Sequence, residues 1–304
     1  MSWNLFEDLQ QMLRFHFMLN ALRAGIIVAV VAGAIGYVMV LRRESFAGHT
    51  LSVIGFPGAA GATWLGLGAM WGFFGFCIAG ALVIAGLPGT RRAGGSGDVG
   101  GAGEQPAGVG TVQAFALACG FLFVSRYHGF LSGLNDLLFG TITGITDAQV
   151  LVLLAAGTLT LTALLLLGRP LMFATLDPEI AAASGVPVRL INSGYLVLLG
   201  IAAAGTSQVT GSLLVFALLV APAAAATRFT ARPAAGLSLS IGIALLITLA
   251  GETAAFFTPF PIGFWVTTFG FAAFLLASAY RAATDRFGQR WPSAPALSPA
   301  GGRR

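Results

Sequence analysis

Long runs of apolar residues dominate the chain and limit the structures that it can form. A helix needs about 20 mostly apolar residues to cross the hydrocarbon core of a bilayer. The sequence therefore predicts an all-α integral membrane protein, a polytopic bundle of about nine transmembrane helices. Because several apolar runs are short and closely paired, a count of eight to ten helices remains open. The nine segments are 17–41, 50–67, 69–87, 111–127, 149–168, 189–207, 211–228, 235–257 and 262–281.

The composition also favours a membrane protein. Hydrophobic residues make up 57% of the 304 residues and charged residues 9%, whereas a soluble domain has roughly 25% charged residues. The sequence pI of about 10.0 comes from arginines between the apolar runs. Anionic lipid headgroups are the natural counterpart of such arginines, so we expect membrane lipid as a partner and no nucleic acid.

The arginines predict the orientation of the chain. All sixteen basic residues are arginines, and most can lie on one side of nine alternating spans. The positive-inside rule makes that side cytoplasmic, which places the N-terminus outside and the C-terminus inside. The inner set comprises Arg42, Arg43, Arg91, Arg92, Arg169, Arg189, Arg228, Arg232, Arg281, Arg286, Arg290, Arg303 and Arg304, and the outer set comprises Arg14, Arg23 and Arg126.

The segments around the transmembrane domain, residues 17–281, have distinct compositions. We expect residues 1–16 to form an amphipathic extracytoplasmic segment, because they lack the features of a secretory signal peptide. Residues 88–110 have the glycine-rich composition of a flexible cytoplasmic loop, and 130–147 predict an outer or half-inserted helix. The tail, 282–304, has the proline-rich composition of a disordered cytoplasmic segment.

No enzyme motif is visible in the sequence. A phosphate-binding P-loop requires a lysine, and the chain has none. Paired CxxC, HExxH and G-x-S-x-G motifs are absent as well. Cys77 and Cys119 lie inside apolar runs, which is typical of small buried side chains. We therefore expect a protein that is not an enzyme and is not its own ATPase.

His49 is a candidate for handling an ion within the apolar runs. An ionisable group there costs about 2.5 to 3.5 kcal/mol on insertion scales, so each one suggests a function. His49 shares a helical face with Ser52, Val53 and Phe56, and Pro57 should free backbone carbonyls nearby. The alternative is that His49 lies at the cytoplasmic interface beside the arginines.

Glu252 is the second candidate, because it stands alone among apolar residues near the outer end of its run. Its alternative is an interfacial carboxylate that reaches the outer headgroups. Asp136 and Asp147 are expected to be solvated or helix-capping, and His16 and His128 to be solvated or interfacial.

A short cytoplasmic helix is predicted over residues 177–187. Asp177 is a suitable N-cap, Pro178 fits the first helical position, and Glu179 belongs in the first turn. Gly185 followed by Pro187 provides the stop. The helix either connects two spans or docks a cytoplasmic partner.

Several motifs together resemble the membrane-permease subunits of bacterial ABC importers for zinc, manganese and iron. The resemblance covers about residues 20–280 in the family's order. It rests on a cytoplasmic D-P-E-x-A…G element, an R-R-x-[SA]-F-x-G stretch ending in P-G, an outer L-F-G, a G-x-L-L-V…P span and a P-x-G. The matching residues include Asp177, Pro178, Glu179, Ala181, Gly185, Gly48, Pro57, Gly58, Gly140, Gly211, Pro222, Pro261 and Gly263.

This resemblance implies a permease in the bacterial cell membrane that forms the translocation pathway as a homodimer or with a similar permease. Two cytoplasmic ATPase subunits would dock on the coupling helices at 177–187, and an extracytoplasmic metal-binding protein would deliver the ion. No cofactor would be bound permanently. The cargo would be a divalent zinc, manganese or iron ion.

The chain departs from the family where the pathway residues are expected. The family's D-x-L-S-H is here His49-Thr50-Leu51-Ser52-Val53. Imidazole suits zinc and carboxylate suits manganese, so His49 facing its symmetry mate, completed by Glu252, would make an altered metal site. The alternatives are a permease for a metal chelate or another small ligand, and an ion-coupled secondary transporter, which sparse intramembrane carboxylates disfavour.

Overall fold

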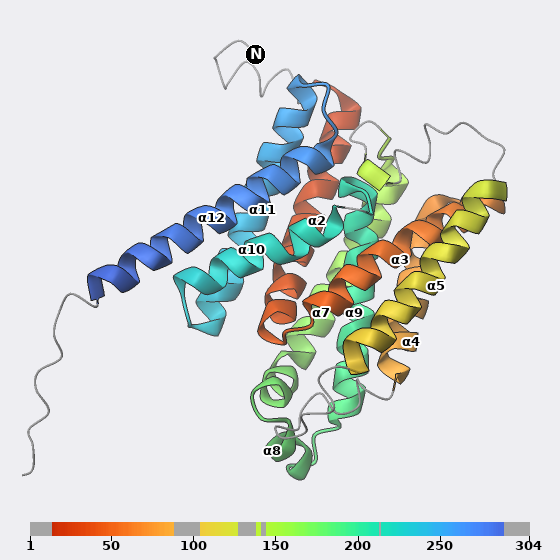
Figure 1. Cartoon of the computed structure of the whole chain (residues 1–304). Coiled ribbons are helices and arrows are strands. Elements are labelled where there is room, and N and C mark those ends of the chain that lie inside the picture. Colours follow the sequence, from red (N-terminus) through yellow and green to blue (C-terminus); the bar gives the residue numbers. More distant parts are fainter. Residues whose placement is uncertain (1–13, 88–103, 127–137, 141–143, 213, 289–304) are drawn as a thin grey trace, which may run out of the picture.

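The computed structural model describes residues 14–87, 104–126, 138–140, 144–212 and 214–288, and helices account for nearly all of this part (Figure 1). In chain order, the helices are α2 (His16–Leu41), α3 (Ser45–Trp64), α4 (Ala69–Gly86), α5 (Glu104–Arg126), α7 (Asp147–Leu176), α8 (Pro178–Ala183), α9 (Val188–Thr210), α10 (Val215–Phe229), α11 (Pro233–Phe257) and α12 (Ile262–Gly288).

Each predicted span overlaps one helix, which confirms a polytopic helical fold. By length and composition, seven of the described helices could cross a membrane: α2, α4, α5, α7, α9, α11 and α12. The apolar α10 has only 15 residues. The helix α3 is rich in glycine, serine and threonine, and most of its residues are buried. Its lower hydropathy therefore fits a helix that other helices surround.

Three helix boundaries differ from the prediction. The helix α10 begins at Val215 and not at 211, because Gly211 has a φ of 77° that ends α9. The helix α5 begins at Glu104, inside the predicted loop, since a proline in the first turn removes no helical hydrogen bond. The helix α12 continues to Gly288, because alanines follow residue 281 and favour helix.

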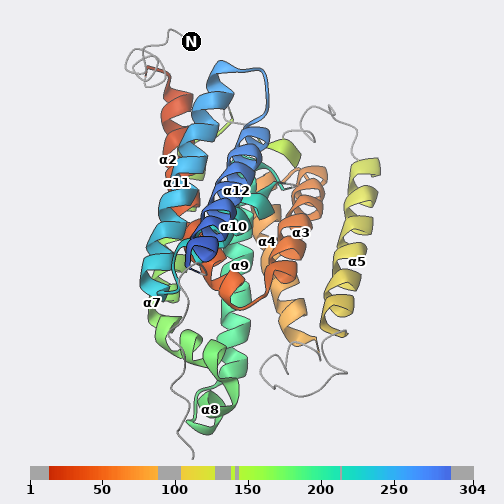
Figure 2. The same cartoon turned by 60° about the vertical axis from the view of Figure 1, so that its left-hand side comes forward.

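The helix α2 lies at the centre of the bundle, against α7, α9, α10 and α11. The helices α3, α4 and α5 form a group on one side in both views, and α3 and α4 join it to α9 (Figure 2). The helices α10, α11 and α12 pack together on another side. The helix α8 lies at the end of the bundle opposite the start of α2 (Figure 1).

Small residues allow α2 and α11 to pack closely. A Cβ on Gly33 would come within 2.7 Å of the Ile241 backbone, and the Ser240 hydroxyl donates a 2.8 Å hydrogen bond to the Gly33 carbonyl. Gly36 lies directly against the Leu219 carbonyl of α10. Such contacts are typical of membrane helices, where close packing replaces the hydrophobic effect between helices.

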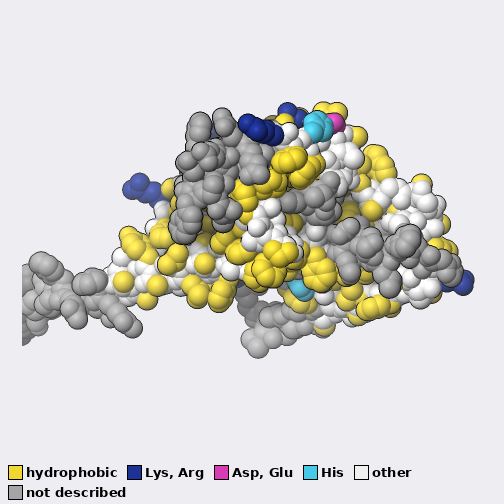
Figure 3. All heavy atoms as spheres, turned by 90° about the horizontal axis from the view of Figure 1, so that it is seen from above, with side chains coloured by type: hydrophobic (Ala, Val, Ile, Leu, Met, Phe, Trp, Pro, Cys, Tyr) yellow, Lys and Arg dark blue, Asp and Glu magenta, His cyan; other side chains and the backbone are white. Residues whose placement is uncertain are grey.

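Large apolar side chains remain exposed along the flanks of the bundle, as on α7, where Leu165 is 79% exposed and Leu166 is 76% exposed. From above, hydrophobic side chains are spread over the described surface and few charged side chains are visible (Figure 3). The exposed leucines along the flanks suit acyl chains better than water.

Candidate functional site

His49 lies on α3 and faces α10. Its ring is half-buried and meets the Phe216 ring edge-on, with 5.1 Å between the centroids. Its Nδ1 atom is buried and has no hydrogen-bond partner. A neutral imidazole nitrogen without a hydrogen-bond partner is one of the ligand types that divalent transition metals accept.

Ser52 lies one turn beyond His49 on the same helix. It is buried, and its hydroxyl donates a 2.8 Å hydrogen bond to the Gly48 carbonyl. The hydroxyl oxygen keeps lone pairs that could accept or coordinate. Val53 is half-buried beside it and offers no ligand atom. The altered motif thus leaves His49 as the principal donor on this face of α3.

Glu252 lies at a different interface. Its side chain is fully buried on α11, and a Cβ on Gly25 of α2 would overlap its carboxylate. Neither carboxylate oxygen has a hydrogen-bond partner. Glu252 therefore contacts α2, whereas His49 contacts α10. The metal site between protomers that the sequence suggests for these two residues stays a prediction.

The environment of Glu252 predicts the effect of removing its charge. Glu252→Gln keeps the shape and removes a buried ionisable group that has no hydrogen-bond partner, and such a group is costly within a membrane protein. We expect a Tm equal to or above that of the wild type. Glu44→Gln is the matched control: Glu44 pairs with Arg42 at 2.9 Å, so its loss should cost about 1 to 3 kcal/mol. A large fall in Tm for Glu252→Gln alone would show that the carboxylate is charged and paired.

The other ionisable residues that the sequence suggested as candidates are exposed where they are described. His16 pairs with Asp147 at 3.2 Å, and their side chains are 71% and 65% exposed. Asp147 is the first residue of α7, next to a capping box formed by Thr146 and Gln149. Asp136 and His128 lie outside the described residues.

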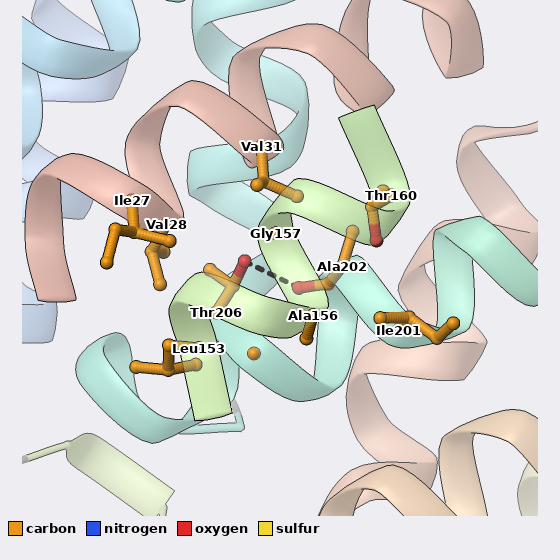
Figure 4. A pocket seen from close by; sticks show the side chains of 11 residues that line it. Ile27, Val28, Val31, Leu153, Ala156, Gly157, Thr160, Ile201, Ala202 and Thr206 are labelled. Carbon is orange, nitrogen blue, oxygen red and sulfur yellow. Dashed lines mark hydrogen bonds between the residues drawn. The ribbon is translucent and has the colours of Figure 1, made fainter. Parts of the chain in front are cut away.

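No described group of three or more His, Cys, Asp or Glu side chains could hold a metal ion. A cavity of about 10 Å³ lies between α2, α7 and α9 (Figure 4), and apolar side chains such as Val31 and Leu153 line most of it. Thr206 on its wall bonds to the Ala202 carbonyl of its own helix. A space of this size admits about one water molecule, so it is not a cargo site.

Three glycines from separate motifs meet at one place. A Cβ on Gly211 would overlap the backbone of Leu138 and Gly140, and a Cβ on Gly140 would overlap the Val209 carbonyl. Gly263, at the start of α12, lies against the carbonyls of Phe139 and Thr210, where a Cβ would come within 3.0 Å and 2.8 Å. The L-F-G, G-x-L-L-V and P-x-G segments therefore form one backbone-to-backbone contact, the glycine cluster Gly140, Gly211 and Gly263.

The remaining motif residues also serve packing. Gly58 of α3 and Gly72 of α4 lie against each other's carbonyls, and Gly48 lies against the Met39 sulfur. Pro57 and Pro222 lie within the helices α3 and α10, and both are buried. Pro261 directly precedes α12.

The helix α8 matches the predicted caps but covers only residues 178–183 of the 177–187 segment. The Asp177 carboxylate accepts a 3.0 Å hydrogen bond from the Ile180 amide, and Pro178 occupies the first position. Gly185 has a φ of 82°, as a glycine beyond a helix end should. Ala181 is buried, whereas Glu179 is exposed.

A polar cluster at the α8 end of the bundle was not apparent from the sequence. Arg42 there hydrogen-bonds to Glu44, Thr175 and Asn192. The sequence shows polar residues at the ends of three apolar runs. It does not show that Arg42 bonds to the others, because these contacts depend on the fold. The glycine cluster was likewise unforeseen, although its three motifs had been noted.

The long apolar helices, the short helix α8 at one end and the small-residue packing define a multi-pass helical membrane protein. The chain belongs to the ABC 3 transport family, whose model matches residues 14–281. It shares its fold with a chain of PsaBC from Streptococcus pneumoniae in complex with a Fab, with a TM-score of 0.77, 24% identity and coverage of 90% of this chain and 95% of that one.

The relatives of the chain include two proteins named for metal transport. The manganese transport system membrane protein MntC of Halalkalibacterium halodurans is 28% identical over 251 residues, 82% of this chain and 82% of the relative. The chelated iron transport system membrane protein YfeD of Yersinia pestis is 28% identical over 218 residues, 72% of this chain and 70% of the relative.

Proposed function

We propose that the chain is the permease subunit of an ATP-driven ABC importer for a divalent transition-metal ion, with manganese, iron and zinc as candidates. The family match over residues 14–281 carries this proposal. The names of the relatives, which specify manganese and chelated iron transport, support a metal cargo. The chain would form the translocation pathway in the bacterial cell membrane and perform no catalysis itself.

A separate ATPase would drive transport. The chain lacks the lysine of a P-loop, and α8 provides a surface for a partner at one end of the bundle. Ile180 of α8 is 56% exposed, and Glu179 is exposed beside it. We propose that two ATPase subunits dock on the α8 helices of a permease dimer, on the cytoplasmic side. The exposed Glu179 and Ile180 would contact the ATPase, while Asp177, Pro178, Gly185 and the buried Ala181 would shape and anchor the helix.

The opposite end would face the exterior. In this orientation the N-terminus lies outside, the C-terminus lies inside, and the arginines near α8 follow the positive-inside rule. An extracytoplasmic metal-binding protein would deliver the ion near the glycine cluster. Lipid headgroups would contact the arginines at both ends.

Within the pathway we assign the ion contact to His49, with Ser52 beside it on α3. The His49 nitrogen without a partner supports this role. One histidine from each protomer would give a two-imidazole site, which suits zinc and other borderline metals better than a carboxylate site does. Glu252 is assigned to the α2–α11 interface.

ATPase stimulation would test this function. The chain is purified in lipid nanodiscs with its ATPase and binding protein, and ATP hydrolysis is measured with Mn²⁺, Fe²⁺ and Zn²⁺. We expect one ion to stimulate hydrolysis. If the ATPase binds and a metal chelate stimulates hydrolysis but no free ion does, the transported species is a metal chelate and not a free ion. Absence of ATPase binding would contradict the proposal.

A further inference from the structure

The Arg42 side chain joins three parts of the chain that are far apart in sequence. Its Nε and Nη2 atoms donate to Glu44 Oε1 at 3.2 and 2.9 Å, Nη1 donates to Thr175 Oγ1 at 3.0 Å, and Nη2 donates to Asn192 Oδ1 at 2.8 Å. The Arg42 side chain is only 5% exposed and that of Glu44 is 14% exposed. We name this group the Arg42 cluster.

The cluster holds both ends of the segment that contains α8. Thr175 belongs to the last turn of α7, two residues before the N-cap Asp177, and Asn192 belongs to the first turns of α9. A displacement of α8 must move the ends of α7 and α9 that flank it. Arg42 therefore contacts the chain on either side of α8 at the same time.

The same arginine contacts the turn that begins α3. Glu44 is the N-cap residue of α3, and His49 follows five residues later. The turn between α2 and α3 is tight: the Glu44 amide bonds to the Met39 carbonyl at 3.1 Å and the Arg43 amide to the Val40 carbonyl at 3.2 Å. These are the two hydrogen bonds of a Schellman helix end.

Arg43 makes this turn costly to form. Its φ is 58°, the only positive φ of a non-glycine residue among the described residues. A left-handed conformation costs an ordinary residue roughly 1 to 2 kcal/mol, so the surrounding contacts must compensate. The paired Arg42 and Glu44 side chains on either side of Arg43 are the contacts in place to do so.

An aromatic ring also contacts the Arg42 side chain. Its guanidinium lies 5.1 Å from the centroid of the Tyr195 ring on α9, and the Tyr195 hydroxyl donates to the Ile35 carbonyl of α2 at 3.3 Å. A planar guanidinium with five donors can stack and bridge in this way, whereas a lysine ammonium cannot.

We propose that Arg42 is a positioning residue, through which the α8 segment sets the α2–α3 turn and hence the helix that carries His49. This inference rests on the proposed function, because it assumes that an ATPase acts on α8. Movement imposed on α8 would reach α3 through Thr175, Asn192 and the Arg42–Glu44 pair. The ion contact would respond to ATP hydrolysis by this route.

The test compares variants in proteoliposomes that contain the permease, its ATPase and its binding protein. For Arg42→Lys we expect basal ATP hydrolysis near the wild-type rate, with cargo-stimulated hydrolysis and uptake reduced about tenfold or more. Arg43→Ala is the matched control, because the adjacent arginine is exposed, and it should retain both activities. A purely structural role would instead lower complex yield and basal hydrolysis together.

Two further variants cover the case in which Arg42→Lys does not assemble. Thr175→Val and Asn192→Leu each remove one contact to the α8 segment and leave the Arg42–Glu44 pair intact. Each should reduce stimulated hydrolysis and uptake while basal hydrolysis stays unchanged. Wild-type stimulation in all assembled cluster variants would overturn the proposal. Absence of stimulation in the wild type would instead count against the proposed function.

Discussion

Replacing Gly211 by alanine is expected to destabilise the protein by about 3 kcal/mol or more. Gly211 has φ 77° and ψ 153°, a conformation essentially confined to glycine. Its added Cβ would also overlap the backbone of Leu138 and Gly140, and backbone cannot rotate away as a side chain can. Yield of monodisperse protein and Tm measure the effect.

Gly66→Ala separates the two causes of this loss. Gly66 has a similar φ of 75° but no atom within 4 Å of an added Cβ. It should therefore lose only about 1 to 2 kcal/mol from backbone strain. Equal losses in the two variants would show that the contact within the glycine cluster contributes nothing to stability.

His49→Ala is expected to reduce cargo-stimulated ATP hydrolysis and uptake by about tenfold or more, as the loss of a ligand at a metal site does. The fold should persist, because the ring is half-buried and its Nδ1 has no hydrogen-bond partner to lose. Metal titration of the purified complex and the stimulated rate measure the change.

His16→Ala serves as the control for this variant. His16 is an exposed histidine near the opposite end of the bundle, paired with Asp147, so its removal should leave transport unchanged. Full activity of His49→Ala would remove His49 from the pathway, whatever the cargo is.

Features that depend on neighbouring residues could be predicted from the sequence. Apolar runs of about 20 residues predicted the helices, because a helix of that length spans the hydrocarbon core of the bilayer. The caps of α8 were readable as well, since the Asp177 side chain bonds only three residues away. The ends of α5 and α12 were misjudged, because a glycine-rich or polar composition does not prevent a helix from extending beyond its apolar part.

Contacts between distant parts of the chain could not be predicted. Arg42 meets Thr175 across 133 positions and Asn192 across 150, and no local pattern encodes either pair. The location of Glu252 against Gly25 depends on the antiparallel packing of α2 and α11. The sequence identified His49 and Glu252 as unusual, but only the packing shows that they face different helices.

ATP-driven uptake tests the central claim most directly. Proteoliposomes that contain the permease, its ATPase and its binding protein are loaded with ATP on the ATPase side, and accumulation of Mn²⁺, Fe²⁺ or Zn²⁺ is followed with time. We predict accumulation that requires ATP and all three components. Accumulation by the permease alone, driven by a proton or sodium gradient without ATP, would contradict the account.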